Sequence, residues 1–200
     1  MTIAVVDYGV GNLFSIYNAL DRIGAGPKLV VEPEELAGFA GIVVPGVGSF
    51  GRCMRRLSRF EEPLRRALDG GTPVLGICVG MQVLFDGSEE SPEEGLGWIR
   101  GDVVRLPDSV LVPQMGWNNL SIRREVEILE GISDEDFFYF VHSYHCVPRD
   151  GQVVAATAEY GTEIAAAISR DNLFAVQFHP EKSGEKGLSI LENFMRLSRC

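Results

Sequence analysis

The residue best suited to chemistry in this 200-residue chain is Cys78, which lies between Gly76 and Gly80. G-x-C-x-G is the nucleophile-elbow pattern with sulfur in place of the serine oxygen. A sharp strand-to-helix turn gives the nucleophile unusual dihedrals and presses strand against helix, so side chains two positions away would collide. The helix N-terminus would also favour thiolate over thiol. Cys78 could equally be a small buried residue at the end of a core strand.

A nucleophilic cysteine needs a general base that is itself oriented by a third group. The chain has three histidines, of which His142 and His145 have no acidic residue close by in the sequence. His179 belongs to H-P-E, and on an extended backbone Glu181 would project to the same side as the imidazole. Pro180 disfavours helix at His179 and supports that extended geometry. The sequence therefore predicts a Cys78–His179–Glu181 triad, against the alternative of a solvent-exposed turn at 179–181.

Acyl transfer also requires two N–H donors for the oxyanion. In elbow enzymes one is the N–H of the residue after the nucleophile, here Val79. The second is expected from a neighbouring strand-end loop, and P-G-V-G at 45–48 fits because its glycines let backbone approach a substrate closely. Either Val47 or Gly48 could supply it.

These residues need a scaffold that brings strand ends together. Apolar runs at 2–6, 29–31, 42–44 and 74–77 alternate with helical patterns at 13–23, 35–39 and 52–66, and the 79–85 segment reads as the start of a buried helix. This alternation predicts an α/β fold with a mostly parallel central sheet and helices on both faces. The turns at 7–12, 45–51 and 76–80 would share the carboxyl edge, where ligands bind.

In the second half of the chain the sequence patterns predict mainly strands. Residues 88–97 are rich in Glu, Ser, Pro and Gly and predict a surface loop. Further strands are expected at 98–106, 117–122, 137–144, 153–158, 163–168 and 173–178, followed by a helix through Leu197. Within 137–144 the alternation places Phe138, Phe140, His142 and Tyr144 on one face. No linker divides the chain, so we expect one domain over residues 1–200.

Two patterns suggest other functions, which are the less favoured interpretations. Arg52, Arg55, Arg56 and Arg59 recur at helical spacing, which favours the solvated face of an amphipathic helix over an anion-binding face. The glycines at 46, 48 and 51 match the dinucleotide fingerprint, and Gly9-x-Gly11 imitates it after the first strand. Each match is incomplete. Phe14 stands where the Gly9-x-Gly11 match needs a third small residue, and the match at 46, 48 and 51 lies in the wrong βα unit.

Composition narrows the class further. The formal net charge of −10 argues against nucleic acid, and no apolar run reaches the length of a membrane span. The absence of a basic leader favours a cytoplasmic protein. The four cysteines are scattered without a C-x-x-C pair, so neither a disulfide framework nor a metal site is expected, and no cofactor is expected either.

Taken together, G-I-C-V-G-M-Q and F-H-P-E resemble the class I, or triad, glutamine amidotransferases. The segments D-Y-G-V-G-N at 7–12, P-G-V-G-S-F at 45–50, P-Q-M-G-W-N at 113–118, F-V-H-S-Y at 140–144 and Q-F-H-P-E-K-S at 177–183 are similar to glutaminase subunits of imidazole glycerol phosphate synthase. The resemblance runs the whole length of the chain and implies a flavodoxin-like fold of that family.

The resemblance implies hydrolysis of L-glutamine to glutamate and ammonia through a thioester. Ammonia would pass to a (β/α)₈ synthase subunit, joined as a heterodimer, that makes imidazole glycerol phosphate and an aminoimidazole carboxamide ribotide in histidine biosynthesis. The implied substrate-holding positions are Gly48, Gln82, His142, Ser143 and Tyr144. The implied partner-facing positions are Gly9, Val10, Gly11, Asn12, Met115, Trp117, Asn118 and Lys182.

Three alternatives stay open: another cysteine hydrolase or peptidase on a related fold, a nucleotide-binding oxidoreductase, and a scaffold without catalysis. The segment 113–118 could also be a surface turn with a buried Trp117. Family members keep the glutaminase slow until the partner is loaded, and the glycine-rich 45–48 loop suggests the same here.

Overall fold

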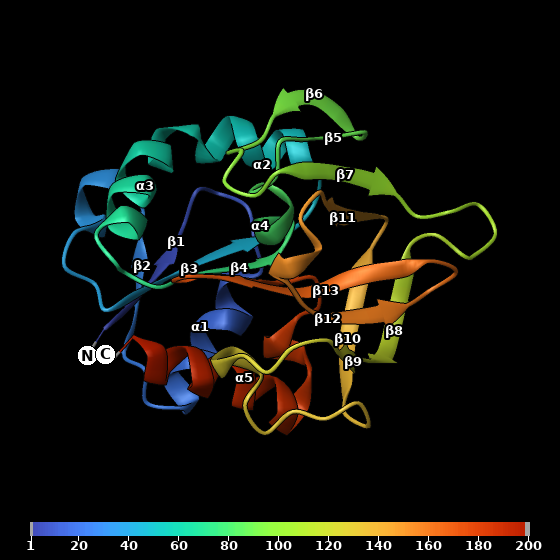
Figure 1. The fold of residues 1–200 in the computed structure, drawn as a ribbon. Helices are drawn as coiled ribbons and strands as arrows, with labels where there is room; N and C mark the ends of the chain where they lie inside the picture. Colours follow the sequence, from blue (N-terminus) through green and yellow to red (C-terminus); the bar gives the residue numbers. More distant parts are fainter. Residues whose placement is uncertain (1, 199–200) are drawn as a thin grey trace.

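A computed structural model describes residues 2–198. In this part of the chain the main sheet has eight strands, and Figure 1 shows it crossing the middle of the molecule. In spatial order the strands are β2 (Pro27–Val30), β1 (Ile3–Val6), β3 (Gly41–Gly46), β4 (Val74–Cys78), β14 (Leu173–Val176), β13 (Glu163–Arg170), β12 (Val154–Glu159) and β9 (Ser121–Ile122). The five strands from β2 to β14 pair parallel with their neighbours. Beyond β14, the strands β13, β12 and β9 each pair antiparallel with the strand before them.

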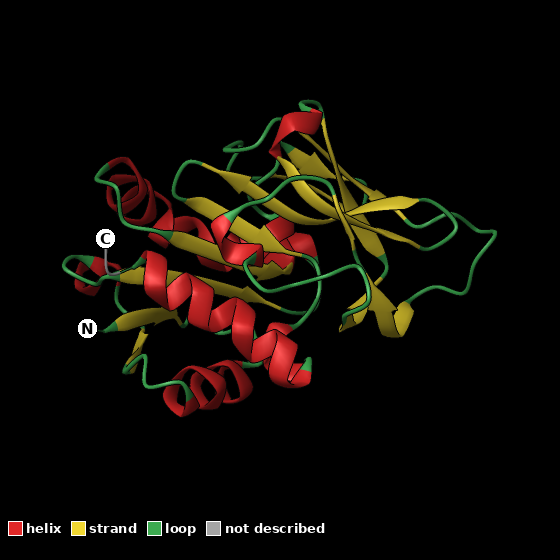
Figure 2. Cartoon of the chain, turned by 60° about the horizontal axis from the view of Figure 1, so that its bottom comes forward, coloured by secondary structure: helices red, strands yellow, loops and turns green. Residues whose placement is uncertain are grey.

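Helices cover both faces of the main sheet, as the alternating pattern predicts. In Figure 1, α2 (Phe50–Leu57) and α3 (Glu61–Asp69) lie on one side, and α1 (Leu13–Arg22) and α5 (Gly184–Leu197) on the other. Figure 2 shows α5 lying across the sheet. Strands β1, β3 and β4 are buried at every position because helices cover both of their faces.

Two smaller sheets stand beside the main one. One pairs β10 (Phe137–His142) with β8 (Gln114–Asn119), and the other contains β11 (Tyr144–Pro148), β7 (Gly101–Arg105), β5 (Gly87–Ser88) and β6 (Ser91–Glu94). The prediction of a loop at 88–97 is therefore wrong for residues 88 and 91–94, which are strand, whereas 89–90 form a turn and 95–97 have no regular structure. Ser, Pro and Glu have low strand propensity, but pairing with the rest of this sheet outweighs it.

The expected strand at 137–144 is divided between the two small sheets. Phe138, Phe140 and His142 are buried on one face, as predicted. The break comes at Ser143, whose carbonyl accepts a hydrogen bond from Leu106 N–H. The placement of Tyr144 on the same face is wrong, because the chain has changed sheets before it.

Several helical predictions also change in length. The segment at 35–39 is a 3₁₀ turn over Pro33–Leu36, and α4 after the elbow contains only Val79–Gln82. The remaining 3₁₀ turns are Ser58–Phe60, Glu127–Leu129, Gly151–Val153 and Pro180–Lys182. Arg52, Arg55, Arg56 and Arg59 are exposed, and the solvated-face interpretation requires this.

Among the described residues, no helix is both long and apolar enough to cross a membrane. Cys53, Cys78 and Cys146 are buried free thiols. Cys200, the fourth cysteine, lies outside the described residues.

Candidate active site

The turn at Cys78 joins β4 to α4 and carries the strain that the glycine pattern predicts. Cys78 has φ of 56°, a region that non-glycine residues rarely occupy. A Cβ added at Gly76 would lie 2.5 Å from the Gly80 carbonyl oxygen, and one at Gly80 would lie 1.9 Å from the Val44 oxygen. Because backbone touches backbone here, only glycine fits at either position.

The same crowding explains the first part of the dinucleotide-like pattern. A Cβ at Gly46 would lie 2.5 Å from the Gly80 nitrogen. Gly46 also pairs with Cys78 in the parallel ladder between β3 and β4. This glycine therefore serves the elbow, and the fingerprint needs no nucleotide to account for it.

His179 lies just beyond β14, the strand next to β4, with Glu181 behind its ring. Its Nδ1 is 2.8 Å from Glu181 Oε1, and both side chains are buried. The predicted extended route is only half right. His179 is extended, but Pro180–Lys182 forms a 3₁₀ turn that brings the carboxylate back to the ring.

The backbone of His179 is fixed from two directions. Its N–H donates to the Tyr139 carbonyl at 2.9 Å, and its carbonyl accepts from the Ser183 hydroxyl at 2.6 Å. The same hydroxyl accepts from Tyr139 N–H at 2.9 Å. Strand β10 and the start of α5 therefore hold the imidazole in place.

The environment of His179 favours its charged form. Burial alone lowers the pKa of this imidazole, but the neighbouring Cys78 and Glu181 outweigh it and raise the pKa to about 9. The Nε2 atom is buried without a regular hydrogen bond among the described residues. Since Glu181 occupies Nδ1, Nε2 is the nitrogen available to the sulfur and to a substrate.

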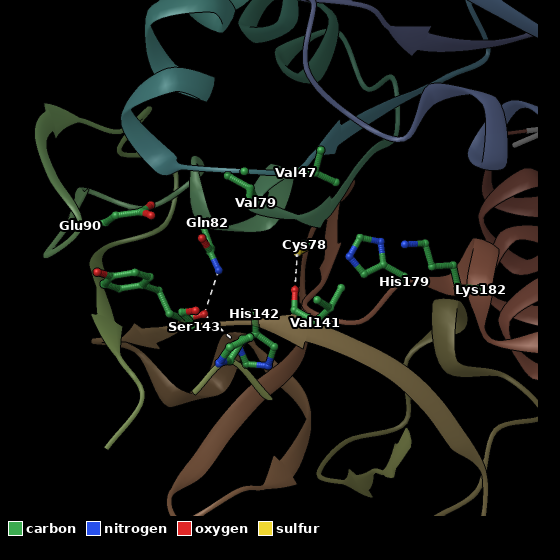
Figure 3. Close-up of a pocket in the computed structure, with 13 residues that line it drawn as sticks. Val47, Cys78, Val79, Gln82, Glu90, Val141, His142, Ser143, His179 and Lys182 are labelled. Atoms are coloured by element: carbon green, nitrogen blue, oxygen red, sulfur yellow. Dashed lines mark hydrogen bonds between the residues drawn. The ribbon is translucent and has the colours of Figure 1, made fainter. Parts of the chain in front are cut away.

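Cys78 and His179 line one pocket of about 400 Å³, into which both side chains point in Figure 3. The volume suits a small amino-acid ligand. The lining residues come from both halves of the chain: Val47, Gly48, Cys78, Val79, Gln82, Glu90, Pro113, Val141, His142, Ser143, Tyr144, His179 and Lys182. Every predicted oxyanion and substrate-binding residue is among them.

A second histidine lines this pocket in a different environment. His142 has its Nδ1 2.9 Å from the Tyr144 carbonyl oxygen and its Nε2 2.9 Å from Gln114 Oε1. Burial lowers the pKa of His142 to about 4, and the backbone hydrogen bond offsets this only in part. His142 is therefore neutral at physiological pH.

Two buried side-chain amides connect the Tyr144 carbonyl to the sulfur of Cys78. The Gln82 amide donates to the Tyr144 carbonyl at 2.9 Å and to Gln177 Oε1 at 3.1 Å. Gln177, which is completely buried, has its amide nitrogen 3.7 Å from Cys78 Sγ. The sequence prediction missed Gln177 as a site residue, although its place two positions before His179 on the same side of the chain was a usable signal.

The sequence prediction also missed Glu90, which enters the pocket from the turn between β5 and β6. Its Oε2 accepts a hydrogen bond of 2.6 Å from Phe50 N–H, at the start of α2. This places a carboxylate in the pocket opposite the His179 end (Figure 3). Nothing in the local sequence marks it, because the segment has the composition of a loop.

The residues expected to face a partner lie on or near the surface, with one exception. Met115 is 65% and Trp117 56% exposed, so the alternative of a buried Trp117 is wrong. The Trp117 and Tyr139 rings meet edge to face with their centres 6.0 Å apart. Lys182 Nζ lies 5.8 Å from the centre of the Tyr139 ring.

The other expected partner-facing positions differ in exposure. Gly9 is exposed, Gly11 and Asn12 are partly so, and the Val10 side chain is buried. Asn118 is half-buried, with its amide donating to the Glu159 carbonyl at 3.0 Å.

A strained cysteine and a carboxylate-backed imidazole share one pocket on an α/β fold, an arrangement that suits acyl transfer through sulfur. The family model described as "Glutamine amidotransferase class-I" matches residues 4–197.

Curated relatives point to one branch of that family. The imidazole glycerol phosphate synthase subunit HisH of Methanothermobacter thermautotrophicus is 50% identical over 99% of this chain and 100% of its own length. HisH of Moorella thermoacetica is 46% identical over 98% and 95%. The chain therefore belongs to the class I glutamine amidotransferases and, within them, to the family of imidazole glycerol phosphate synthase HisH subunits.

Solved structures share the fold at low sequence identity. PurLQS from Thermotoga maritima matches with a TM-score of 0.79 at 19% identity, covering 98% of this chain and 97% of that one. The glutaminase domain of Trypanosoma brucei CTPS, with bound acivicin, matches with a TM-score of 0.72 at 19% identity, covering 100% and 94%. These matches confirm the predicted fold class.

Proposed function

We propose that this chain is the glutaminase subunit of an imidazole glycerol phosphate synthase and hydrolyses L-glutamine with a Cys78–His179–Glu181 triad. The observation that carries the proposal is that Cys78 and His179 open onto one pocket while Glu181 holds the far side of the ring. Membership of the HisH family supports the same substrate.

In the first half of the reaction the Cys78 thiolate adds to the amide carbon of glutamine, and the carbonyl oxygen becomes an oxyanion. The Val79 N–H and an N–H of the 45–48 loop are the proposed donors to that oxyanion. His179, charged because its pKa is about 9, then gives its proton to the departing nitrogen. Ammonia leaves and a glutamyl thioester remains on Cys78.

In the second half His179 is neutral and acts as a base toward water. The hydroxide adds to the thioester carbonyl, the C–S bond breaks, and glutamate leaves with the thiolate and the imidazolium restored. Glu181 stays ionised throughout and stabilises the charged ring. The carboxylic acid that forms passes its proton to the released ammonia, so the net reaction is glutamine plus water to glutamate plus ammonium.

The opposite end of the pocket supplies groups for the amino-acid end of the substrate. The half-buried Glu90 carboxylate suits an ammonium group, because hydrogen bonds between two charged groups are stronger than those between neutral ones. Gln82, His142, Ser143 and Tyr144 line the same end, and Gly48 leaves room for the substrate backbone. Glutamine would lie with its amide at Cys78 and its ammonium near Glu90.

The proposed partner is the synthase subunit, a (β/α)₈ barrel joined as a heterodimer. Exposed Met115 and Trp117 form an apolar surface beside Lys182, and tryptophan and methionine are residue types that are enriched at interfaces. The Gly9–Asn12 loop would border the same interface. Lys182 also lines the active-site pocket, so this surface lies next to the point where ammonia is released.

The proposal is tested by measuring ammonia release from glutamine, with and without the synthase subunit loaded with its substrate. Wild type should be slow alone and faster with the loaded partner, and Cys78→Ala should be inactive in both. Cys146→Ala, which removes another buried thiol, should keep the wild-type rates. A full glutaminase rate in the isolated chain would overturn the predicted dependence on the partner. Cys78-dependent peptide cleavage without glutaminase activity would favour a peptidase.

A further inference from the structure

Besides His179, two hydrogen-bonding groups face the sulfur of Cys78, and they favour different protonation states. The Val141 carbonyl oxygen lies 3.8 Å from Sγ (Figure 3). A carbonyl can only accept, so this contact suits the thiol and is lost by the thiolate. The Gln177 amide nitrogen lies 3.7 Å from the same sulfur and can only donate. A donor to sulfur favours the thiolate, which is the nucleophilic form.

The main sheet places Gln177 beside the sulfur. Strands β14 and β4 run parallel with Val176 paired to Ile77, so the next position along each strand brings Gln177 alongside Cys78. The backbone N–H of Gln177 donates to the Ala166 carbonyl at 2.9 Å, which holds this position against β13. Because Gln177 is completely buried, the polar atoms of its side chain need partners within the protein.

A chain of hydrogen bonds that starts at a backbone carbonyl fixes the orientation of the Gln177 amide. The Tyr144 carbonyl can only accept, so the Gln82 atom 2.9 Å away must be the amide nitrogen. The same nitrogen lies 3.1 Å from the Gln177 amide and can only donate, so it meets the Gln177 oxygen. The Gln177 nitrogen is thereby turned toward the sulfur. A flipped Gln177 would set two donors against each other and an oxygen against the sulfur.

We propose that Gln177 is a catalytic residue whose amide donates a hydrogen bond to the Cys78 thiolate, and that Gln82 is the positioning residue that keeps this donor turned toward the sulfur. The part played in glutamine hydrolysis rests on the proposed function. The effect on the sulfur itself does not, because it follows from the contacts alone.

The donor acts whenever the sulfur carries negative charge. Before the addition to glutamine, it raises the share of Cys78 that is thiolate. In the second half of the reaction the C–S bond breaks, its electron pair returns to sulfur, and the same amide stabilises the departing thiolate. The amide transfers no proton itself, so Gln177 complements His179, which moves the protons.

Alkylation of Cys78 by iodoacetamide tests the donor directly, because the thiolate is the reacting form. The reaction is followed at the Cys78 peptide by mass spectrometry in wild type and in Gln177→Met, which keeps the length of the side chain without the amide. Loss of the donor should lower the thiolate share at pH 7 about 10-fold. The unassisted thiolate is more nucleophilic, which offsets part of this loss, so alkylation should be about 3–5-fold slower.

The pH profile of alkylation separates a lost donor from a merely structural change. Gln177→Met should catch up with wild type as the pH rises to 10, because ionisation then no longer depends on the donor. His179, with its pKa of about 9, and Glu181 behind it are present in both proteins, so the comparison is made between variants at each pH. Gln82→Met should show the same pattern with a smaller loss, since the Gln177 amide is kept but no longer held.

The second measurement is glutaminase activity of the complex with the loaded synthase subunit, where kcat/KM of Gln177→Met should fall about 10-fold. Asn193→Leu is the matched control. Asn193 is another buried amide, which donates to the Ile128 carbonyl at 3.0 Å and the Glu130 carbonyl at 2.9 Å and does not line the pocket. This variant should lose thermal stability without a change in alkylation or in kcat/KM.

An unchanged alkylation rate of Gln177→Met at pH 7 would overturn the inference. So would equal slowing at pH 7 and pH 10, which would indicate blocked access to the sulfur. If Gln177→Met does not fold, Gln82→Met decides, because it must show the same pH-dependent loss. A wild-type complex without glutaminase activity, in which Gln177→Met still slows alkylation, would contradict the proposed function and support the contact between amide and thiolate.

Discussion

Two buried histidines line the pocket, and the two imidazoles have opposite properties. His179 has a pKa raised to about 9, whereas His142 has a pKa lowered to about 4. Burial pushes both values down. The difference lies in the neighbours, because His179 has a carboxylate and a sulfur beside it while His142 has a backbone carbonyl and the neutral amide of Gln114. An imidazole becomes a proton carrier here through its partners and not through its depth.

The largest expected effect comes from exchanging His179 for asparagine, and the same exchange at His142 is the comparison. His179→Asn should lower kcat about 10⁴-fold or more, because it removes the group that moves the proton in both half-reactions. His142→Asn should lower kcat by less than about 10-fold, because it disturbs only hydrogen bonds in the pocket wall. Steady-state glutaminase kinetics of the complex measure both, and similar losses would contradict the division of roles.

The next largest effect is expected at Glu181, the carboxylate that His179 has as a partner and His142 lacks. Glu181→Gln should lower kcat about 10²–10⁴-fold, since a neutral amide stabilises the imidazolium poorly. It should also lower the pKa of His179 from about 9, which an NMR titration of the ring can follow. Glu185→Gln, on the exposed first turn of α5, is the matched control and should change neither quantity.

A smaller effect is expected at the substrate-holding end. Glu90→Gln removes a charged partner of the substrate ammonium, an interaction of about 1.5–3 kcal/mol, so KM for glutamine should rise about 10–100-fold. The value of kcat should change much less, in contrast to Glu181→Gln. Glu94→Gln on the same hairpin, where the side chain is exposed, provides the control. A fall in kcat with unchanged KM would place Glu90 in the chemistry instead.

The smallest effect is in stability against pH, where the two histidines should act on opposite sides. His179 has a raised pKa, so its contribution is fully present below about pH 6.5 and is lost as pH rises through about 9. His142 has a lowered pKa, so its contribution is present above about pH 6.5 and is lost as pH falls toward 4. Thermal melts at a series of pH values should show that His142→Asn weakens the dependence of stability on pH on the acid side. His179→Asn should weaken that dependence on the alkaline side. A weaker dependence on the same side in both variants would refute the assignment.

The sequence predicts the parallel half of the fold well because its signals are local. Apolar runs with short connections specify β1, β3 and β4, and the glycines around Cys78 specify the turn between β4 and α4. The proximity of Cys78 and His179 also follows, since both are placed at carboxyl ends of parallel strands.

The remaining features depend on contacts between distant segments. Glu90 enters the pocket only because a hairpin of loop-like composition pairs into a sheet. The Tyr8 hydroxyl donates to the Pro45 carbonyl, and the Cys53 thiol donates to the Val47 carbonyl. No sequence periodicity predicts these two contacts. The change of sheet at Ser143 likewise depends on Leu106, more than thirty positions earlier in the chain.

The direct backbone contact among Gly46, Gly76 and Gly80 has a consequence for how this protein can change over time. Main-chain atoms fix the spacing of β3, β4 and α4, so the location of the sulfur does not depend on which apolar side chains fill the surrounding interior. The interior can therefore drift in composition while the reactive atom keeps its place, and the tolerance ends abruptly at three positions where even one methyl group is too large.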